Sequence, residues 1–289
     1  GIAFFALRQV QKGGGSGAEA LRYLKDNKGN PHIILATLNS LYTTPLRNPG
    51  LGVDIATFTP IARLAEDTFQ LWVTSDSGIN SVEDYVKAVK AAGPAKWKMG
   101  GTGKGAQSPS GDFMKDYRVF GTGKGAEDSL VTAMLEKKFG LKMTYVPFKG
   151  GGTVAKQLVG KHINSTVNNP SEQAGFWEAG KSRALASFTP PGKLKGRFGQ
   201  IKTFEELGYG KDMVYYMQRS VIGTPGMPKD AQAFYVDVFD KVYKSEAWQK
   251  YLSSKGLVPG WLTGKALTDY FVAELEVHRG LLKELGEIK

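Results

Sequence analysis

Two glycine-rich segments with the same sequence, GTGKGA, are the first candidates for a binding site in this 289-residue chain. They occupy Gly101–Ala106 and Gly121–Ala126, and each follows a run of residues that favours a β-strand. Backbone N–H groups at a helix N-terminus bind anions, because they point at the ligand and the helix dipole favours negative charge. Each segment is therefore a candidate phosphate loop, dinucleotide fingerprint or carboxylate cradle, with a plain tight turn as the alternative.

Both copies depart from the nucleotide-binding signatures. A Walker A loop needs a hydroxyl residue after its lysine, but glycine follows both Lys104 and Lys124. Lys98 and Arg118 stand where the first glycine of that loop is required. The spacing G-x-G-x-x-A fits a dinucleotide fold, but such a fold has an acidic residue at the end of its next strand. Here the next strand, KMTYV, is followed by Pro-Phe-Lys. The carboxylate cradle and the plain turn remain.

A third glycine-rich segment, Lys149–Thr153, also separates an expected strand from an expected helix. In open parallel sheets, ligands bind beyond the carboxyl ends of the strands, so loops after neighbouring strands can face one pocket. We therefore expect one shared anion site, formed by the segment Lys149–Thr153 and a GTGKGA loop.

Composition excludes several classes of function. The chain has no cysteine, and its three histidines, His32, His162 and His278, form no HxxxH or HExxH pair, so we expect no metal site. The formal net charge is +11, but the lysines are scattered, so we expect no nucleic-acid partner. No apolar run approaches the roughly 20 residues of a membrane span. The first ten residues lack the cleavage pattern of a complete signal peptide.

The elements that would position these loops alternate along the chain. Between Lys96 and Phe188, expected strands alternate with expected helices, which indicates a parallel sheet with helices on its faces. Met213–Thr224 is expected to form one long strand that crosses between two domains, and residues 37–50 are expected to form a loop. The remaining C-terminal residues are expected to be helical.

Several motifs then occur in an order that is typical of one receptor family. VPFKGGGTVAKQLVGKHINSTVNNPSEQAGFWEAGKSRALA begins at Val146, and the other motifs are TPIARL, TFEELGY, GTPGMPKDA and KGLVP. In these segments the chain resembles the substrate-binding proteins of tripartite tricarboxylate transporters, also called the Bug family. KGGGSGAEALRYL, near the N-terminus, resembles the first glycine loop and helix of that family. The resemblance spans most of the chain.

The resemblance implies an α/β, two-lobed periplasmic binding protein fold (type II-like), in which each lobe is a sheet flanked by helices and a hinge lies between the lobes. We assign residues 1–95 and 222–289 to the first lobe and 96–221 to the second, with an extra loop near residues 105–124. The implied function is capture of a small mono-, di- or tricarboxylate between the lobes and its delivery to membrane transporter subunits. We expect a monomeric periplasmic receptor with no cofactor and no enzymatic activity.

The resemblance also implies which loops face the ligand, largely through backbone N–H groups. Tyr42 is added because it adjoins the implied first-lobe contacts, where its ring could meet an apolar part of the ligand. The expected contact residues are Thr37, Asn39, Tyr42, Gly101, Thr102, Gly103, Gly121, Thr122, Gly123, Lys124, Lys149, Gly150, Gly151, Gly152, Thr153, Asn168 and Asn169. For Asn168 and Asn169, capping of the helix before Pro170 is the alternative.

The chain departs from the family pattern in two places. The first strand of the family and its P-x-x-P-G-G loop are not found, and GIAFFALRQV precedes the first recognisable motif. The family also has one glycine loop where this chain has two. We expect one GTGKGA copy to line the cleft and the other to lie on the surface of the lobe. The competing hypothesis is an α/β enzyme that binds a nucleotide cofactor in these loops.

Overall fold

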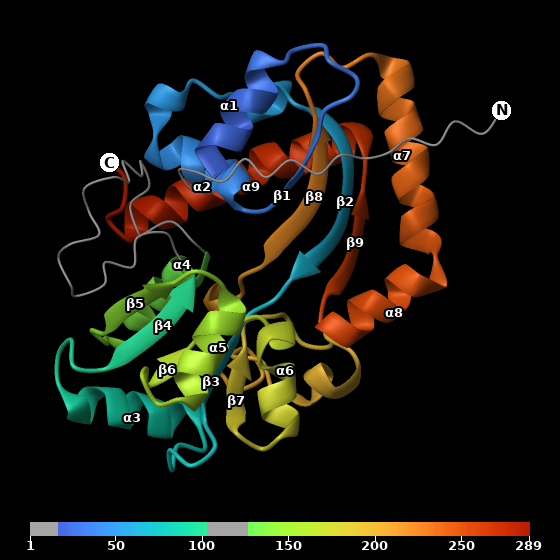
Figure 1. Cartoon of the computed structure of the whole chain (residues 1–289). Coiled ribbons are helices and arrows are strands. Elements are labelled where there is room, and N and C mark those ends of the chain that lie inside the picture. The colour runs from blue at the N-terminus through green and yellow to red at the C-terminus, as the bar shows by residue number, and fades with distance from the viewer. Residues whose placement is uncertain (1–16, 103–126) are drawn as a thin grey trace.

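Two β-sheets, each flanked by helices, organise the residues that the computed structural model describes, which are 17–102 and 127–289 (Figure 1). The first sheet has the strand order β1-β8-β2-β9, and all of its pairs are antiparallel. Its strands are β1 (Ile34–Thr37), β2 (Thr59–Asp67), β8 (Met217–Gly223) and β9 (Val258–Leu262). The expected α/β fold with one sheet in each of two lobes is confirmed.

The second sheet, with the order β5-β4-β6-β3-β7, is mostly parallel. Its strands are β3 (Gln70–Thr74), β4 (Lys98–Thr102), β5 (Thr144–Phe148), β6 (Ser165–Thr166) and β7 (Ser182–Ser187). β4 runs parallel to β5 and β6, as expected. β3 is antiparallel to β6 and β7, because the chain enters the sheet there directly from the end of β2 and must run away from the first lobe. The parallel arrangement predicted for Lys96–Phe188 holds for β4, β5, β6 and β7, which run in one direction, and β3 lies outside that range.

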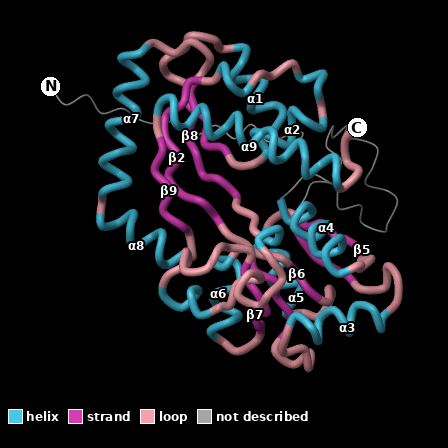
Figure 2. Tube along the Cα trace, turned by 180° about the vertical axis from the view of Figure 1, so that it is seen from behind, coloured by secondary structure: helices cyan, strands magenta, loops and turns pink. Residues whose placement is uncertain are grey.

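Helices cover both faces of the first sheet. One face carries α1 (Ala18–Asp26), α2 (Ser40–Arg47) and α9 (Gly264–Glu284), whose buried side chains share one apolar cluster with Ile222 of β8. The other face carries α7 (Lys229–Lys244), which α8 (Glu246–Lys255) follows (Figure 2). Among the described residues, no helix combines the length and apolar character that a membrane crossing requires.

Helix α2 lies where a loop was expected. Its sequence, SLYTTPLR, includes a proline and two β-branched threonines, which lower helix propensity. Five of its eight side chains are buried, and the helix packs against α9, so tertiary contacts stabilise it. Packing also explains β9, a strand in the C-terminal region that was expected to be helical: it completes the first sheet beside β2. The long strand expected at Met213–Thr224 is shorter, since β8 begins at Met217.

The second sheet carries α3 (Val82–Ala92), α4 (Glu127–Phe139), α5 (Gly151–Val159) and α6 (Pro170–Glu178). Ser81 is the N-cap of α3, and its hydroxyl accepts a hydrogen bond from the Asp84 N–H at 3.0 Å. Buried residues of α3 and α4 form one large apolar cluster with those of β3 and β7.

Two segments pair in the sheet of a different lobe from the one to which the sequence assigned them. Residues 70–95 were expected in the first lobe, but β3 pairs in the second sheet and α3 packs on it. Residues 217–221 were expected in the second lobe, but β8 pairs in the first sheet. β2 continues into β3 across Thr68 and Phe69, so no linker composition marks the change of lobe. We propose boundaries near residues 68 and 216. The extra loop expected near 105–124 lies outside the described residues.

Candidate functional site

Three helix N-termini meet the carboxyl ends of parallel strands in the second lobe. α5 follows β5, α6 follows β6, and the start of α4 lies beside the end of β4. The arrow of β4 points towards the first lobe in Figure 1. The amide of Asn169, at the start of α6, donates to the carbonyl of Thr68, at the passage from β2 to β3, at 2.7 Å. The carboxyl edge of the second sheet therefore adjoins the junction between the lobes, where ligands of open α/β sheets bind.

Of the first GTGKGA copy, the structure describes only Gly101 and Thr102, and both belong to β4. A Cβ added at Gly101 would collide with the Tyr145 hydroxyl and lie 2.8 Å from Cβ of Asp128, so glycine is required there. The Thr102 N–H donates to Oδ2 of Asp128 at 2.6 Å, and its carbonyl accepts from the Tyr145 hydroxyl at 2.7 Å. The backbone of Thr102 is thus engaged within the lobe. Gly103 and Gly121–Lys124 lie outside the described residues.

Asp128 is the second residue of α4, and it holds the start of the helix against β4. Its side chain is buried. Burial raises the pKa of Asp128 to about 7, with a further contribution from neighbouring Glu127, and the hydrogen bond from the Thr102 N–H opposes the rise. This carboxyl group is therefore poised to change its charge near neutral pH.

The segment Lys149–Thr153 forms the expected turn from strand to helix. Gly150 has a φ of 141°, which side-chain-bearing residues rarely adopt, and it is the N-cap of α5. The carboxyl group of Glu172 lies against the first turn: a Cβ at Gly151 would be 2.9 Å from its Oε1. Lys149 and Thr153 are exposed. The start of α5 is therefore open to close backbone contact, with an acidic side chain beside it.

The two asparagines after β6 hold this region together. Asn168 is buried: its Nδ2 donates to the Gly151 carbonyl at 3.3 Å, and its Oδ1 accepts from Nε2 of Gln173 at 3.1 Å. Asn169 occupies the N-cap of α6, but its side chain makes no capping hydrogen bond and bonds instead to Thr68. Side-chain capping is therefore wrong for Asn169. Both amides fix the starts of α5 and α6 relative to the passage between lobes.

The expected first-lobe contacts are largely internal. Thr37 ends β1 with 9% of its surface exposed. Tyr42 has no exposed surface, and its ring packs 6.2 Å from that of Phe271 and 5.0 Å from that of His278, measured between ring centroids. Tyr42 is a core residue in this conformation because α2 turns it towards α9, so the structure does not place it in a loop beside a ligand.

Asn39 connects the start of α2 to the approach to β8. Its Nδ2 donates to the Tyr216 carbonyl at 2.7 Å and the Tyr215 hydroxyl at 3.0 Å, and its Oδ1 accepts from the Gln218 N–H at 3.0 Å. Nε2 of His278 lies 3.2 Å from Nδ2 of Asn39. Asn39 therefore holds the polypeptide at one of the passages between the two lobes.

His278, which the sequence did not single out for this role, completes the Asn39 network from α9. Nδ1 of His278 is 2.8 Å from the Glu274 carbonyl oxygen, which only accepts, so we place the proton on Nδ1 and an acceptor at Nε2. Burial lowers the pKa of His278 to about 4, although the Glu274 hydrogen bond favours the charged form. The ring is neutral at physiological pH, and its role is structural.

A group of charged residues at the junction between lobes was also missed by sequence reasoning. Asp67, at the end of β2, is paired with Arg219 of β8, whose Nε donates to Oδ2 at 3.2 Å. Glu127 opens α4 and Glu172 lies in the first turn of α6. Burial raises the pKa of Glu127, and Arg219 opposes the rise. Burial and Asp67 raise the pKa of Glu172. For Glu127 and Glu172, the available signal was their position at helix starts.

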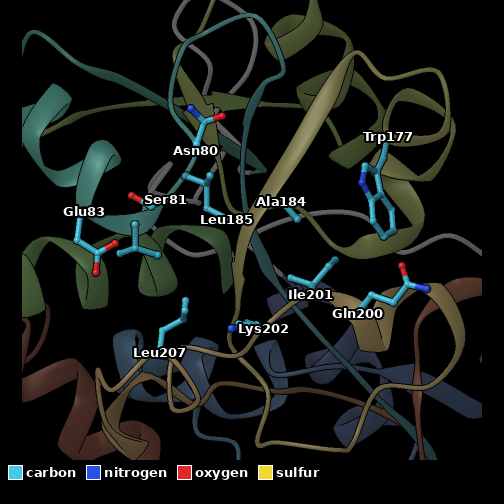
Figure 3. Close-up of a pocket in the computed structure, with 11 residues that line it drawn as sticks. Asn80, Ser81, Glu83, Trp177, Ala184, Leu185, Gln200, Ile201, Lys202 and Leu207 are labelled. Carbon is cyan, nitrogen blue, oxygen red and sulfur yellow. The ribbon is translucent and has the colours of Figure 1, made fainter.

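Two cavities of the described chain lie away from these residues. One, of about 380 Å³, lies in the second lobe between the start of α3 and Trp177, with Lys202 and Leu207 along its wall (Figure 3). The other, of about 440 Å³, lies in the first lobe between the end of α2 and Arg279. None of the expected contact residues that the structure describes lines either cavity. Among the described residues, no group of three or more His, Asp or Glu side chains could hold a metal ion.

Comparison of sequences gives one family and one curated relative. The profile of the tripartite tricarboxylate transporter family receptor matches residues 115–286. A protein of Cupriavidus necator, described as the UPF0065 protein in the gbd 5' region, is 24% identical over 230 residues. The match covers 79% of this chain and 62% of that protein, so the chain spans less than two thirds of the relative's length.

Solved structures share the fold. Rpa4515 of R. palustris, solved with adipate, has a TM-score of 0.78 and 21% identity, and the match covers 94% of this chain and 84% of that one. MatC of Rhodopseudomonas palustris, solved with malate, has a TM-score of 0.73 and 14% identity, with 93% and 85% covered. At these identities the likeness establishes the two-lobed fold and not the ligand.

Proposed function

This chain belongs to the tripartite tricarboxylate transporter receptor family, and from that premise we propose that it captures a small carboxylate between its two lobes and delivers it to a membrane transporter. The family consists of receptors, not enzymes. Adipate and malate, the ligands of two proteins with the same fold, are both carboxylates and support this ligand class. We further propose that the receptor works in the periplasm, as a monomer, and that the lobes close on the ligand by hinge motion.

The observation that carries the proposal is the convergence of α4, α5 and α6 at the carboxyl edge of β4, β5 and β6. A ligand carboxylate at the start of α5 would meet backbone N–H groups and the positive end of the helix dipole. The glycines there permit close approach of the backbone to a ligand. We assign the principal carboxylate contact to Gly150–Gly152, with Asn168 and Asn169 as residues that hold α5 and α6 in position.

The function is tested by thermal unfolding with and without carboxylates. A ligand that binds only the folded state raises the melting temperature by mass action. We expect at least one member of a panel of mono-, di- and tricarboxylates, including adipate and malate, to raise it, and NAD and ATP to leave it unchanged. Stabilisation by nucleotides and by no carboxylate would instead support the enzyme hypothesis.

The location of the site is tested by placing a charge at the start of α5. Gly152 is exposed and has no positive φ, and a Cβ there would lie 3.3 Å from Oε2 of Glu172, a flexible side chain that can move aside. Gly152→Asp should therefore fold, because the start of a helix favours an acid and offsets the repulsion by Glu172. We expect it to weaken carboxylate binding by roughly tenfold or more through like-charge repulsion. Gly175→Asp adds the same charge to open space on α6 and should change the affinity little. Equal effects of the two substitutions would refute this location.

A further inference from the structure

The end of α8 in the first lobe lies against the start of α6 in the second lobe (Figure 1). Gly256 follows α8 and is buried. A Cβ placed on it would lie 2.8 Å from both Cβ and Cγ of Pro170, the first residue of α6, and 2.9 Å from Cδ2 of Phe198. Carbon atoms pack at about 3.5–4.0 Å, so a side chain at this position would push the two lobes apart.

Gly256 also has the conformation of a helix cap, which by itself favours glycine. It ends α8 with a φ of 66°, in the left-handed region that side-chain-bearing residues rarely adopt. Gly140, which follows α4, has a φ of 61°, but no described atom lies within 4 Å of a Cβ built there. The two glycines therefore carry the same backbone constraint, and the contact with the other lobe distinguishes Gly256.

Thr68, at the passage from β2 to β3, is hydrogen-bonded to both sides of this contact. Its hydroxyl donates to the Gly256 carbonyl at 3.2 Å, and its own carbonyl accepts from Nδ2 of Asn169 at 2.7 Å. The neighbouring Asn168 donates to the Gly151 carbonyl in the first turn of α5 at 3.3 Å. A displacement of the start of α6 would therefore be passed on to the start of α5.

We propose that Gly256 is a positioning residue for ligand binding: because it has no side chain, α6 can lie against the first lobe, and this contact holds the start of α5 at the correct distance from that lobe. The inference rests on the proposed function, which assigns the carboxylate contact to the start of α5. A binding site must be held within about 0.5 Å of its productive geometry, so a displaced α6 impairs it. Thr68 supports the same contact through its two hydrogen bonds.

The experiment compares Gly256→Ala with Gly140→Ala. Titration calorimetry uses adipate, malate and any other carboxylate of the panel that stabilises the wild type. We expect Gly256→Ala to weaken binding by roughly tenfold or more, because the new methyl group displaces the start of α6. Gly140→Ala introduces the same backbone strain and should lower stability but leave the affinity of the folded protein unchanged. Equal affinity losses in the two variants would show that Gly256 is only a helix cap and would overturn the proposal.

A second pair of variants tests the same contact if Gly256→Ala does not fold. Thr68→Val removes the hydroxyl that donates to Gly256 and keeps the shape of the side chain. Thr59→Val is its control, since Thr59 is also buried and its hydroxyl donates to the Thr224 carbonyl at 2.7 Å, within the first lobe. We expect only Thr68→Val to weaken carboxylate binding. Equal affinities of the two valine variants would contradict the role of the contact.

Hydrogen exchange of the protein without ligand separates this inference from the function on which it rests. Relative to a peptide from α3, a peptide from the start of α6 should exchange faster in Gly256→Ala than in Gly140→Ala, because only the first variant disturbs the contact. Equal exchange in the two variants would overturn the positioning role even if carboxylates bind. If no carboxylate of the panel binds the wild type, the proposed function fails, and faster exchange in Gly256→Ala would still support the role of Gly256 in placing α6.

Discussion

At the scale of single residues, Asp128 joins two elements of the site and also makes the free energy of unfolding depend on pH. Its carboxylate accepts a hydrogen bond from the Thr102 N–H, and this bond joins the start of α4 to the end of β4. The residue is nonetheless buried beside Glu127, so the folded protein retains its proton up to about pH 7. An unfolded aspartate releases its proton near pH 4. Between these values the folded state binds more protons than the unfolded chain, and the free energy of unfolding therefore falls as pH rises.

Asp128→Asn should remove this dependence, because an asparagine oxygen can still accept from Thr102 and carries no charge at any pH. We expect the variant to gain about 1–3 kcal/mol relative to the wild type as pH rises from about 5 to about 8. Urea unfolding at a series of pH values measures the difference between the two free energies of unfolding. Parallel pH curves for the two proteins would contradict the prediction.

At the scale of elements, Asn39 joins α2 to β8, because its side chain donates one hydrogen bond to the backbone and accepts another, as a paired strand residue would. Its amide gives one hydrogen bond to the Tyr216 carbonyl and takes one from the Gln218 N–H. The side chain has 1% exposure, so water cannot replace these bonds. The first turn of α2, a helix of low intrinsic propensity, is thereby tied to a sheet strand.

Asn39→Ala should therefore cost about 2–4 kcal/mol of stability, because it leaves buried donors and acceptors unpaired. Asn48→Ala, at the exposed C-cap of the same helix, should cost less than about 0.5 kcal/mol. Chemical unfolding of both variants provides the comparison. A loss below about 1 kcal/mol for Asn39→Ala would show that the network can be repaired by its neighbours.

The elements that were predicted correctly from the sequence are those with local sequence signals. β4 and β5 were recognisable because the runs of strand-favouring residues that precede the glycine-rich segments are local signals. α2 and β9 were not, because contacts distant in the sequence stabilise them. The glycine turn before α5 was found from its composition, whereas the pairing of Asp67 with Arg219 depends on residues 152 positions apart that meet only after folding. The sequence therefore predicts which types of residue stand at helix starts, but it does not predict which residues they pair with in the folded protein.

At the scale of the whole molecule, the lobes share an apolar core as well as two passages of the chain. The cluster of the second sheet includes Leu46 of α2, Met217 of β8 and Leu282 of α9, all of which belong to first-lobe elements. Lys137 of α4 and Glu284 of α9 add an ion pair at 2.7 Å on the same side. The last turns of α9 thus pack against the second lobe, although the helix begins on the first sheet.

We expect the two lobes to unfold together because of this shared core. Leu282 is fully buried, so Leu282→Ala should lower the free energy of unfolding by about 2–4 kcal/mol. Native-state hydrogen exchange should show the same loss for the slowest amides of β8 in the first sheet and of β3 in the second, since both report the same global opening. Val277→Ala, at a site on α9 that is 60% exposed, should change neither set appreciably. If Leu282→Ala affected β3 and left β8 protected, the lobes would be independent folding units, and α9 would only lie against the second lobe without joining it to the first.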